Sequence, residues 1–182
     1  MEAIVWGNVM KPVRILFAAA LLSLPLAACG EGGSSASAVQ EAKVEQARLQ
    51  EFVPLLPKAP KGFAAAAPVL TTGDDKSVVS ITYTAPTTDS FSVEITFSNA
   101  EVEKFQKMLD EPKERNKAAA EVNQIAGKDA LSFTSPVVTR AQYVMIVSPS
   151  RFVSVTPVFG DTLKPIMRSV FEQIDFAAVA AK

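Results

Sequence analysis

The residue with the most distinctive chemistry in this sequence is Cys29, the only cysteine among 182 residues. A thiol is a nucleophile and a site of covalent modification. Cys29 closes the quartet Leu26-Ala27-Ala28-Cys29, which ends a nearly unbroken apolar run over residues 15–26. Two basic residues precede that run, Lys11 and Arg14. A basic start, an apolar stretch and small residues at its end are the parts of an export signal.

The quartet resembles the lipobox of bacterial lipoproteins, in which an aliphatic residue and two small residues precede a cysteine. The whole segment is similar to the signal peptides of that family. In the family, the cysteine sulfur receives a diacylglycerol, a dedicated peptidase cuts before the cysteine, and the new amine is usually acylated. The resemblance therefore implies that residues 1–28 are removed, that Cys29 anchors the mature chain to a membrane, and that recognition and cleavage depend on Leu26, Ala27 and Ala28.

Two other interpretations of this segment fit its residues less well. Residues 15–28 number 14, whereas a membrane-spanning helix needs about 20 apolar residues. Ordinary secretory cleavage after Ala28 needs a small residue two positions earlier, where Leu26 stands. Residues 1–9 add an acid and a tryptophan ahead of the basic pair, so Met10 is an alternative start of the signal.

The composition excludes several kinds of site. The chain has no histidine, and the lipid would consume its only thiol, which excludes His/Cys zinc sites and Ser-His or Cys-His nucleophile pairs. We therefore expect no catalytic residue, no metal and no cofactor. Removal of residues 1–28 takes away two basic side chains and one acidic one, which leaves a net charge near −2. Binding of a nucleic acid calls for a basic patch or stripe, and this charge balance does not favour such a partner.

The rest of the chain divides by composition into a tether, a helix and a domain. Residues 29–38 are rich in Gly and Ser and predict a lipidated cysteine followed by a flexible tether. Residues 39–53 predict a spacer helix that docks on the domain or binds a partner. Residues 54–182 are long enough for one globular domain. In enteric members of the lipoprotein family, Asp after the cysteine causes retention at the inner membrane, so Gly30 implies the outer membrane.

Six segments of the globular part are predicted to be strands. Apolar and polar residues alternate in residues 79–83 and 91–97, so Val93 and Ile95 should face the core while Glu94 faces water. Four more strands are expected in two hairpins, at residues 122–125, 131–134, 143–147 and 152–155. Their more apolar sequences predict a central place in the sheet. Arg140 and Arg151 should lie at solvated strand ends.

Two helices are predicted around these strands. Ser98 and Glu101 have the spacing of a capping box, so a helix should begin there and dock on the apolar side of the sheet. The charged residues 110–117 after it predict a solvated loop. Residues 160–161 should cap a last helix whose apolar stripe contains Met167 and which ends before a loose Ala-rich tail.

Together these segments predict a single α+β domain, an antiparallel sheet of about six strands with helices packed on one face. We expect a non-enzymatic function: a lipid-anchored domain that faces the periplasm and binds or scaffolds another component of the bacterial cell envelope. One alternative is an envelope hydrolase that uses carboxylates, or serine and lysine. A second is a peptidoglycan tether through Lys182, because a terminal lysine links one abundant lipoprotein of the family to the wall. The simpler interpretation of Lys182 is a solvated chain end.

Overall fold

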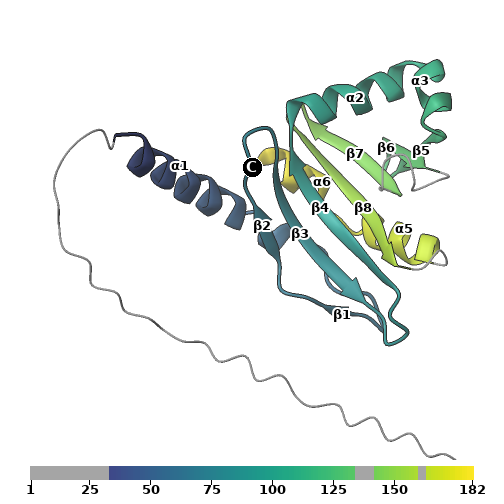
Figure 1. The fold of residues 1–182 in the computed structure, drawn as a ribbon. Coiled ribbons are helices and arrows are strands. Elements are labelled where there is room, and N and C mark those ends of the chain that lie inside the picture. The colour runs from purple at the N-terminus through teal and green to yellow at the C-terminus, as the bar shows by residue number, and fades with distance from the viewer. Residues whose placement is uncertain (1–32, 134–141, 160–162) are drawn as a thin grey trace, which may run out of the picture. The chain divides into compact units, whose positions relative to one another are not determined.

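The computed structural model describes residues 33–133, 142–159 and 163–182, which belong to one folded unit, Gly33–Lys182. This unit is an α+β domain built on one antiparallel sheet, the class expected from the sequence (Figure 1). The described strands of the sheet are β1 (Ala64–Ala65), β2 (Val69–Thr71), β3 (Ser77–Thr84), β4 (Ser90–Phe97), β5 (Ala120–Ile125), β6 (Lys128–Phe133), β7 (Tyr143–Ser148) and β8 (Arg151–Phe159). All six expected strands are present, and the short β1 and β2 raise the number to eight.

The strands lie in the order β1-β3-β4-β8-β7-β6-β5, and β2 also pairs with β3. The three expected hairpins are β3–β4, β5–β6 and β7–β8. The expectation that the last four strands lie centrally is wrong for β5, which forms an edge of the sheet. Its sequence explains the position, because Glu121 and Gln124 are exposed and suit an edge strand. The centre is instead the long pairing of β4 with β8.

Five helices accompany the sheet in the described residues: α1 (Gly33–Gln50), α2 (Asn99–Asp110), α3 (Pro112–Lys117), α5 (Lys164–Glu172) and α6 (Phe176–Ala181). A short 3-10 turn, η1 (Val53–Leu55), follows α1. α1 begins earlier than the expected spacer helix, so residues 33–38 are helical and do not belong to a flexible tether. Within the described ranges, no helix is long and apolar enough to cross a membrane.

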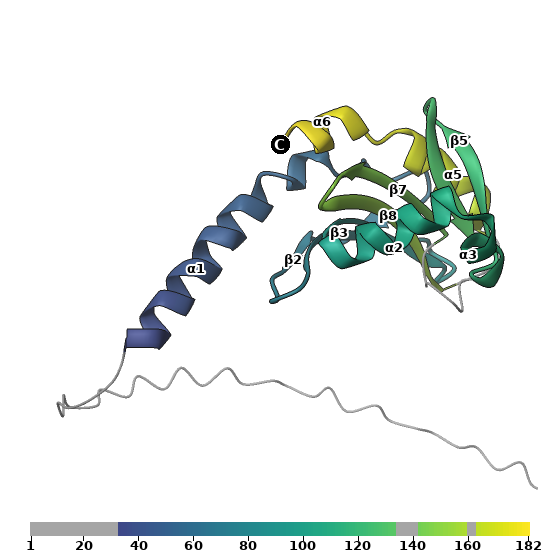
Figure 2. The same ribbon diagram turned by 90° about the horizontal axis from the view of Figure 1, so that it is seen from above.

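One face of the sheet carries the main core. Alternate residues of β3 and β4 point to it, as the period of two predicts, and Val93 and Ile95 are 0% and 1% exposed. α5 and α6 cover this face (Figure 2). The apolar stripe expected on the last helix is confirmed, since Met167 is buried in this core. The end of α1 joins the same core through Leu49 and Phe52.

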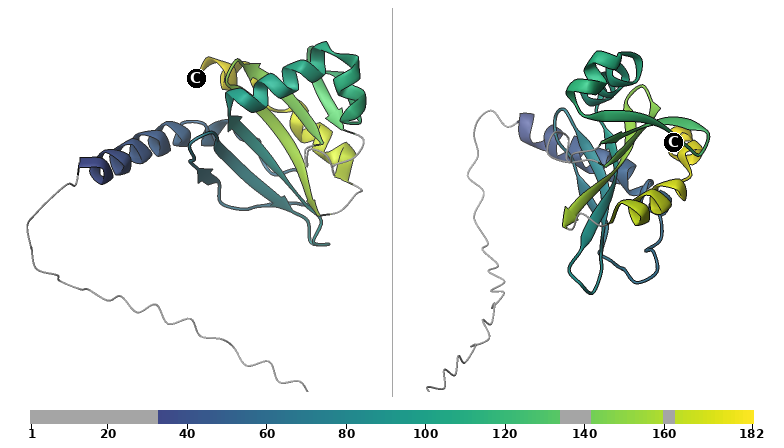
Figure 3. Two further views of the ribbon diagram at one scale, coloured as in Figure 1. Left: turned by 45° about the horizontal axis from the view of Figure 1, so that its top comes forward. Right: turned by 90° about the vertical axis from the view of Figure 1, so that its right-hand side faces the viewer.

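The opposite face carries a second core under α2, which corrects the expectation that the helices pack on one face (Figure 3). The ring of Phe105 in α2 meets the ring of Phe152 in β8 edge to face, with centroids 4.9 Å apart. β7 is apolar at consecutive positions, where Val144 belongs to this second core and Met145 to the main one. A strand of that kind needs cover on both sides. One layer of helices could not have buried it.

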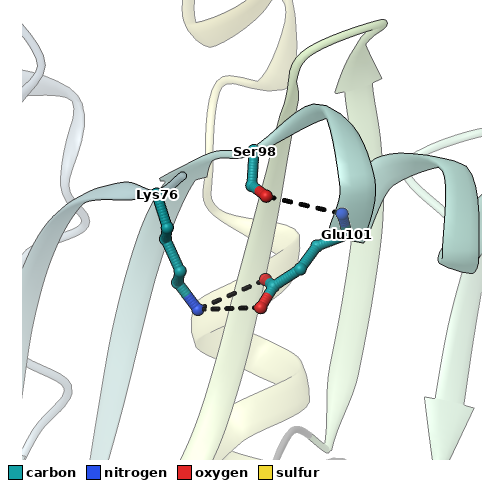
Figure 4. A network of polar contacts seen from close by, with 3 residues as sticks. All are labelled: Lys76, Ser98 and Glu101. Atoms are coloured by element: carbon teal, nitrogen blue, oxygen red, sulfur yellow. Dashed lines mark hydrogen bonds and ion pairs between the residues drawn. The ribbon is translucent and has the colours of Figure 1, made fainter. Parts of the chain in front are cut away.

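α2 begins where the sequence predicts, but with half of the expected capping box. The Oγ of Ser98 accepts a hydrogen bond from the backbone N–H of Glu101 at 3.4 Å (Figure 4). The reciprocal bond is replaced by other contacts. The carboxylate of Glu101 pairs with Lys76 at 3.2 Å, and the backbone N–H of Ser98 donates to the carbonyl of Ser150 at 3.0 Å. The helix start is thereby tied to both neighbouring turns.

The charged stretch after α2 forms the short helix α3, which corrects the expectation of a solvated loop there. Pro112 occupies the first turn of α3, where its missing N–H costs no helical hydrogen bond. The guanidinium of Arg115 donates to the carbonyls of Met108 and Leu109 at 3.1 and 2.5 Å. A proline that ends one helix therefore starts the next, and an arginine of the second helix satisfies the carbonyls at the end of the first.

The chain end is also more ordered than a loose tail. α5 ends at Glu172, and Asp175 caps α6 by accepting a hydrogen bond from the N–H of Ala178 at 2.9 Å. Val179, in the middle of the Ala-rich stretch, is 0% exposed. The stretch expected to be solvated is therefore a packed helix. The cap predicted at residues 160–161 lies outside the described residues.

Candidate functional site

The predicted lipidation site lies outside the described residues. This holds for Cys29, for Leu26, Ala27 and Ala28 before it, and also for Arg140. Lipidation therefore stays a prediction from the sequence, and the described residues bear only on what such an anchor would carry.

α1, the helix that follows this segment, stands in solvent for most of its length. From Val39 to Ala47 its residues are exposed, apart from the half-buried Glu45. From Val39 to Gln50, only Leu49 in the last turn is buried. A helix of 18 residues spans about 27 Å at 1.5 Å per residue. A helix whose side chains are mostly exposed and which leads into a folded body has the form of a spacer.

Polar residues of β3, β4 and β8 line up on one side of the sheet, the side on which α2 packs. This side of the sheet faces the viewer in Figure 1. We call the surface formed by these polar residues the hydroxyl face. It consists of two rows of directly opposed residues, Thr82–Ser92–Thr156 and Ser80–Glu94–Ser154. Among the described elements, α2 packs on β6, β7 and β8 on this side, and no helix lies over β3 and β4. The hydroxyl face is therefore covered by no described helix over β3 and β4, and four of its six residues are half-buried.

The charge of the hydroxyl face comes from Glu94 alone. Its side chain is half-buried, and Ser92 Oγ donates a hydrogen bond to its Oε1 at 3.3 Å. The neighbouring Ser92 and Ser154 are 7% and 2% exposed, so the larger side chains around them form the accessible surface. Such a surface offers hydroxyl donors and acceptors and one carboxylate acceptor.

The sequence indicates four of the six residues of the hydroxyl face. The alternation in residues 79–83 places Ser80 and Thr82 on the polar side of β3. The alternation in residues 91–97 places Ser92 and Glu94 on the wet side of β4. It misses Thr156, because the expected last strand stops at residue 155, whereas β8 continues to Phe159, and it misses Ser154 because that strand is expected to be apolar and central. The signal was available, since Val153, Ser154, Val155 and Thr156 alternate apolar and polar.

The described residues contain no catalytic arrangement of acids. In these ranges, no Asp or Glu side chain is fully buried, and no three His, Cys, Asp or Glu side chains gather in a metal-binding arrangement. A carboxylic acid that serves as a general acid at neutral pH needs apolar surroundings that raise its pKa. The carboxylate hydrolase considered as an alternative therefore finds no such pair in this part of the chain.

Lys182, the residue of the tether alternative, lies beside the end of α1. Its Nζ is 3.7 Å from Oε2 of Glu51, and its side chain is 40% exposed. α6 brings it there because Phe176 and Val179 are buried in the main core. The ε-amine is therefore placed by a docked helix next to a carboxylate of the same chain.

Comparison with known proteins adds no relative: no family model, curated protein or solved structure matches this chain.

Proposed function

We propose that this chain is a lipid-anchored domain of the bacterial cell envelope that faces the periplasm and binds or scaffolds another envelope component without catalysing a reaction. The observation that carries the proposal is α1, a helix of 18 residues that follows the predicted lipidation site and is exposed from Val39 to Arg48, apart from the half-buried Glu45. A chain whose anchor is its first residue needs such a segment to hold the body clear of the headgroups. The lipobox quartet at residues 26–29 supports the same arrangement.

The binding surface in this proposal is the hydroxyl face. It is uncovered on β3 and β4 and rests on a rigid, well-packed sheet. Polar groups on rigid strands are held in fixed positions, so a partner meets them without a large loss of side-chain freedom. The hydroxyls of this face and the carboxylate of Glu94 supply the donors and acceptors for such contacts.

Replacement of Cys29 by Ser tests the anchor. The variant should leave the membrane fraction or accumulate as an uncleaved precursor, because each buried lipid methylene contributes about 0.8 kcal/mol and two or three chains give a stable anchor. Fractionation with detergent partition measures this, with Ser37→Ala as a matched control outside the quartet. A Cys29→Ser protein that is cleaved and still membrane-bound contradicts the lipobox interpretation.

The same fractionation tests the choice of membrane. Gly30→Asp should move the protein from outer to inner membrane fractions if the host sorts lipoproteins as the enteric members of the family do.

A photo-crosslinking residue at Ser80 tests the hydroxyl face as the binding surface. It should give a defined adduct in cells, whereas the same residue at the exposed Ser169 of α5 should not. Equal labelling from both positions argues against the hydroxyl face as the binding surface.

A further inference from the structure

The joint between α1 and the domain is built from an unusual set of side chains. Arg48 at the end of α1 places its guanidinium 4.8 Å from the centroid of the Phe97 ring. Arg151 at the start of β8 lies 5.2 Å from the Phe52 ring and 5.5 Å from the Phe97 ring. The two rings meet edge to face, with centroids 4.9 Å apart. We call these four residues, Arg48, Phe52, Phe97 and Arg151, the clamp.

Arg151 connects the clamp to the other end of the chain. Its Nη1 donates a hydrogen bond to the carbonyl of Val179 in α6 at 2.5 Å. Arg151 is not the solvated strand end expected from the sequence: its side chain is half-buried, and burial together with the charge of Arg48 lowers its pKa. A second contact joins the same two helices where Lys182 meets Glu51.

The arrangement costs free energy unless the aromatic rings hold it. Two guanidinium groups repel each other, and desolvation of Arg151 adds to that cost. The ring faces of Phe52 and Phe97 offset both, because a cation over an aromatic face is attracted by its quadrupole. Arg48 is further held by Glu45 at 2.7 Å. One partly dehydrated cation, Arg151, and one exposed cation, Arg48, on two rings form a directional contact, whereas an apolar patch would let the helix slide.

We infer that the clamp fixes the angle between α1 and the sheet, so that α1 is a rigid arm and not a swinging tether. The main alternative is a hinge in residues 51–55, where the α-helix gives way to the turn η1. The clamp spans that turn, with Arg48 before it and with Phe97 and Arg151 on the sheet. If the proposed anchor is correct, the domain is then held at one orientation about 27 Å beyond the start of the helix. The rigidity itself does not depend on the anchor.

Distances between two spin labels test the rigidity. Labels on cysteines at Lys43→Cys in α1 and Lys104→Cys in α2, both exposed positions, report the angle in the full chain with Cys29→Ser as background. Pulsed electron resonance in detergent should give one narrow distance distribution. Arg151→Ala, alone or with Arg48→Ala, should widen the distribution at least about twofold. Arg168→Ala, which removes an exposed arginine of α5 paired with Glu172, is the control and should leave it narrow.

A second measurement separates a loosened joint from an unfolded domain. In Arg151→Ala, the amides of Phe52, Leu55 and Leu56, which are hydrogen-bonded in the turn, should exchange about tenfold faster. Amides of β4 should keep their protection. The exposed Arg48→Ala should still fold and should widen the distances by itself. A broad distribution in the unmodified clamp, or equal widths in all variants, overturns the inference. Absence of membrane binding in the protein that keeps Cys29, together with a narrow distribution in the labelled protein, would contradict the proposed function and leave the clamp intact.

Discussion

At the scale of single residues, neighbouring positions of β4 have opposite environments. Ile95 is 1% exposed in the main core, whereas Glu94 beside it lies half-buried on the hydroxyl face. Ile95→Asp places an unpaired carboxylate in apolar surroundings and should cost about 4 kcal/mol or more of the free energy of unfolding. Glu94→Ala should change it by no more than about 0.5 kcal/mol. Urea denaturation followed by circular dichroism measures both, and similar midpoints would show that the facing of β4 is wrong.

The buried Tyr83 leads to a prediction about the stability of the domain at alkaline pH. Its ring is 0% exposed, its hydroxyl donates to the carbonyl of Pro57, and burial raises its pKa to about 12 from the ordinary 10.0. Between pH 10 and 12 the unfolded chain loses a proton that the folded protein keeps, so the free energy of unfolding falls as the pH rises. At pH 11 this loss is about 1.4 kcal/mol.

Tyr83→Phe removes the titrating group and tests this directly. At pH 8 the variant should be less stable by about 1 kcal/mol because one hydrogen bond is lost. Between pH 8 and pH 11 it should lose less stability than the wild type, by about 1.4 kcal/mol. Tyr143, whose pKa burial also raises, contributes with the same sign in both proteins and cancels in the comparison. Parallel pH profiles for the two proteins would exclude the contribution of Tyr83.

At the scale of elements, the start of α2 is the point at which the second core is fixed to the sheet. Ser98→Ala removes the side-chain acceptor of the Glu101 N–H and should lower the free energy of unfolding by about 1 kcal/mol. Glu101→Gln should have a smaller effect, because its ion pair with Lys76 is exposed and such pairs contribute little. Thermal unfolding compares the two variants with the exposed Ser169→Ala as control. A larger effect for Glu101→Gln than for Ser98→Ala would show that the ion pair dominates.

The strands could be predicted from the sequence better than the placement of the helices. Alternation identifies β3 and β4 because each has one apolar and one polar side. Alternation does not identify β1 and β2, because strands of two and three residues are too short to show a period. The apolar residues of α2 show that one side of the helix is buried. They do not show which face of the sheet it packs on, because Val102 and Phe105 fit any apolar surface. The consecutive apolar residues of β7 held that information, since they require cover on both sides.

The candidate surfaces were predictable to different degrees, for physical reasons. The polar side of β4 follows from alternation in one segment. The clamp does not, because Arg48, Phe97 and Arg151 lie far apart in sequence and meet only when β4 pairs with β8 and α1 docks beside them. From sequence alone, an arginine at a strand end is predicted to be solvated. Only the fold shows that aromatic rings lie beside its guanidinium. Contacts of this kind depend on topology and leave no local pattern.

At the scale of the whole molecule, the C-terminal end of α1 and the last residues of the chain meet at one place. The end of α1 and the end of α6 are joined by Arg151 and by the pair of Lys182 with Glu51. The C-terminal end of α1 and the last residue of the chain are therefore held beside each other at the start of β8. This arrangement bears directly on whether Lys182 could serve a second attachment, to peptidoglycan.

We expect Lys182 to form no link to the wall. A transpeptidase must reach an extended, accessible chain end, but α6 is helical to Ala181 and Val179 is fully buried. Release of Lys182 would require undocking of the last turn of α6 and loss of the contact with Glu51. Sacculi boiled in detergent and digested with muramidase should release no more of the wild-type protein than of a Lys182→Ala variant. A muramidase-dependent band that disappears in Lys182→Ala would show instead that α6 undocks in the cell and that the chain is a wall tether.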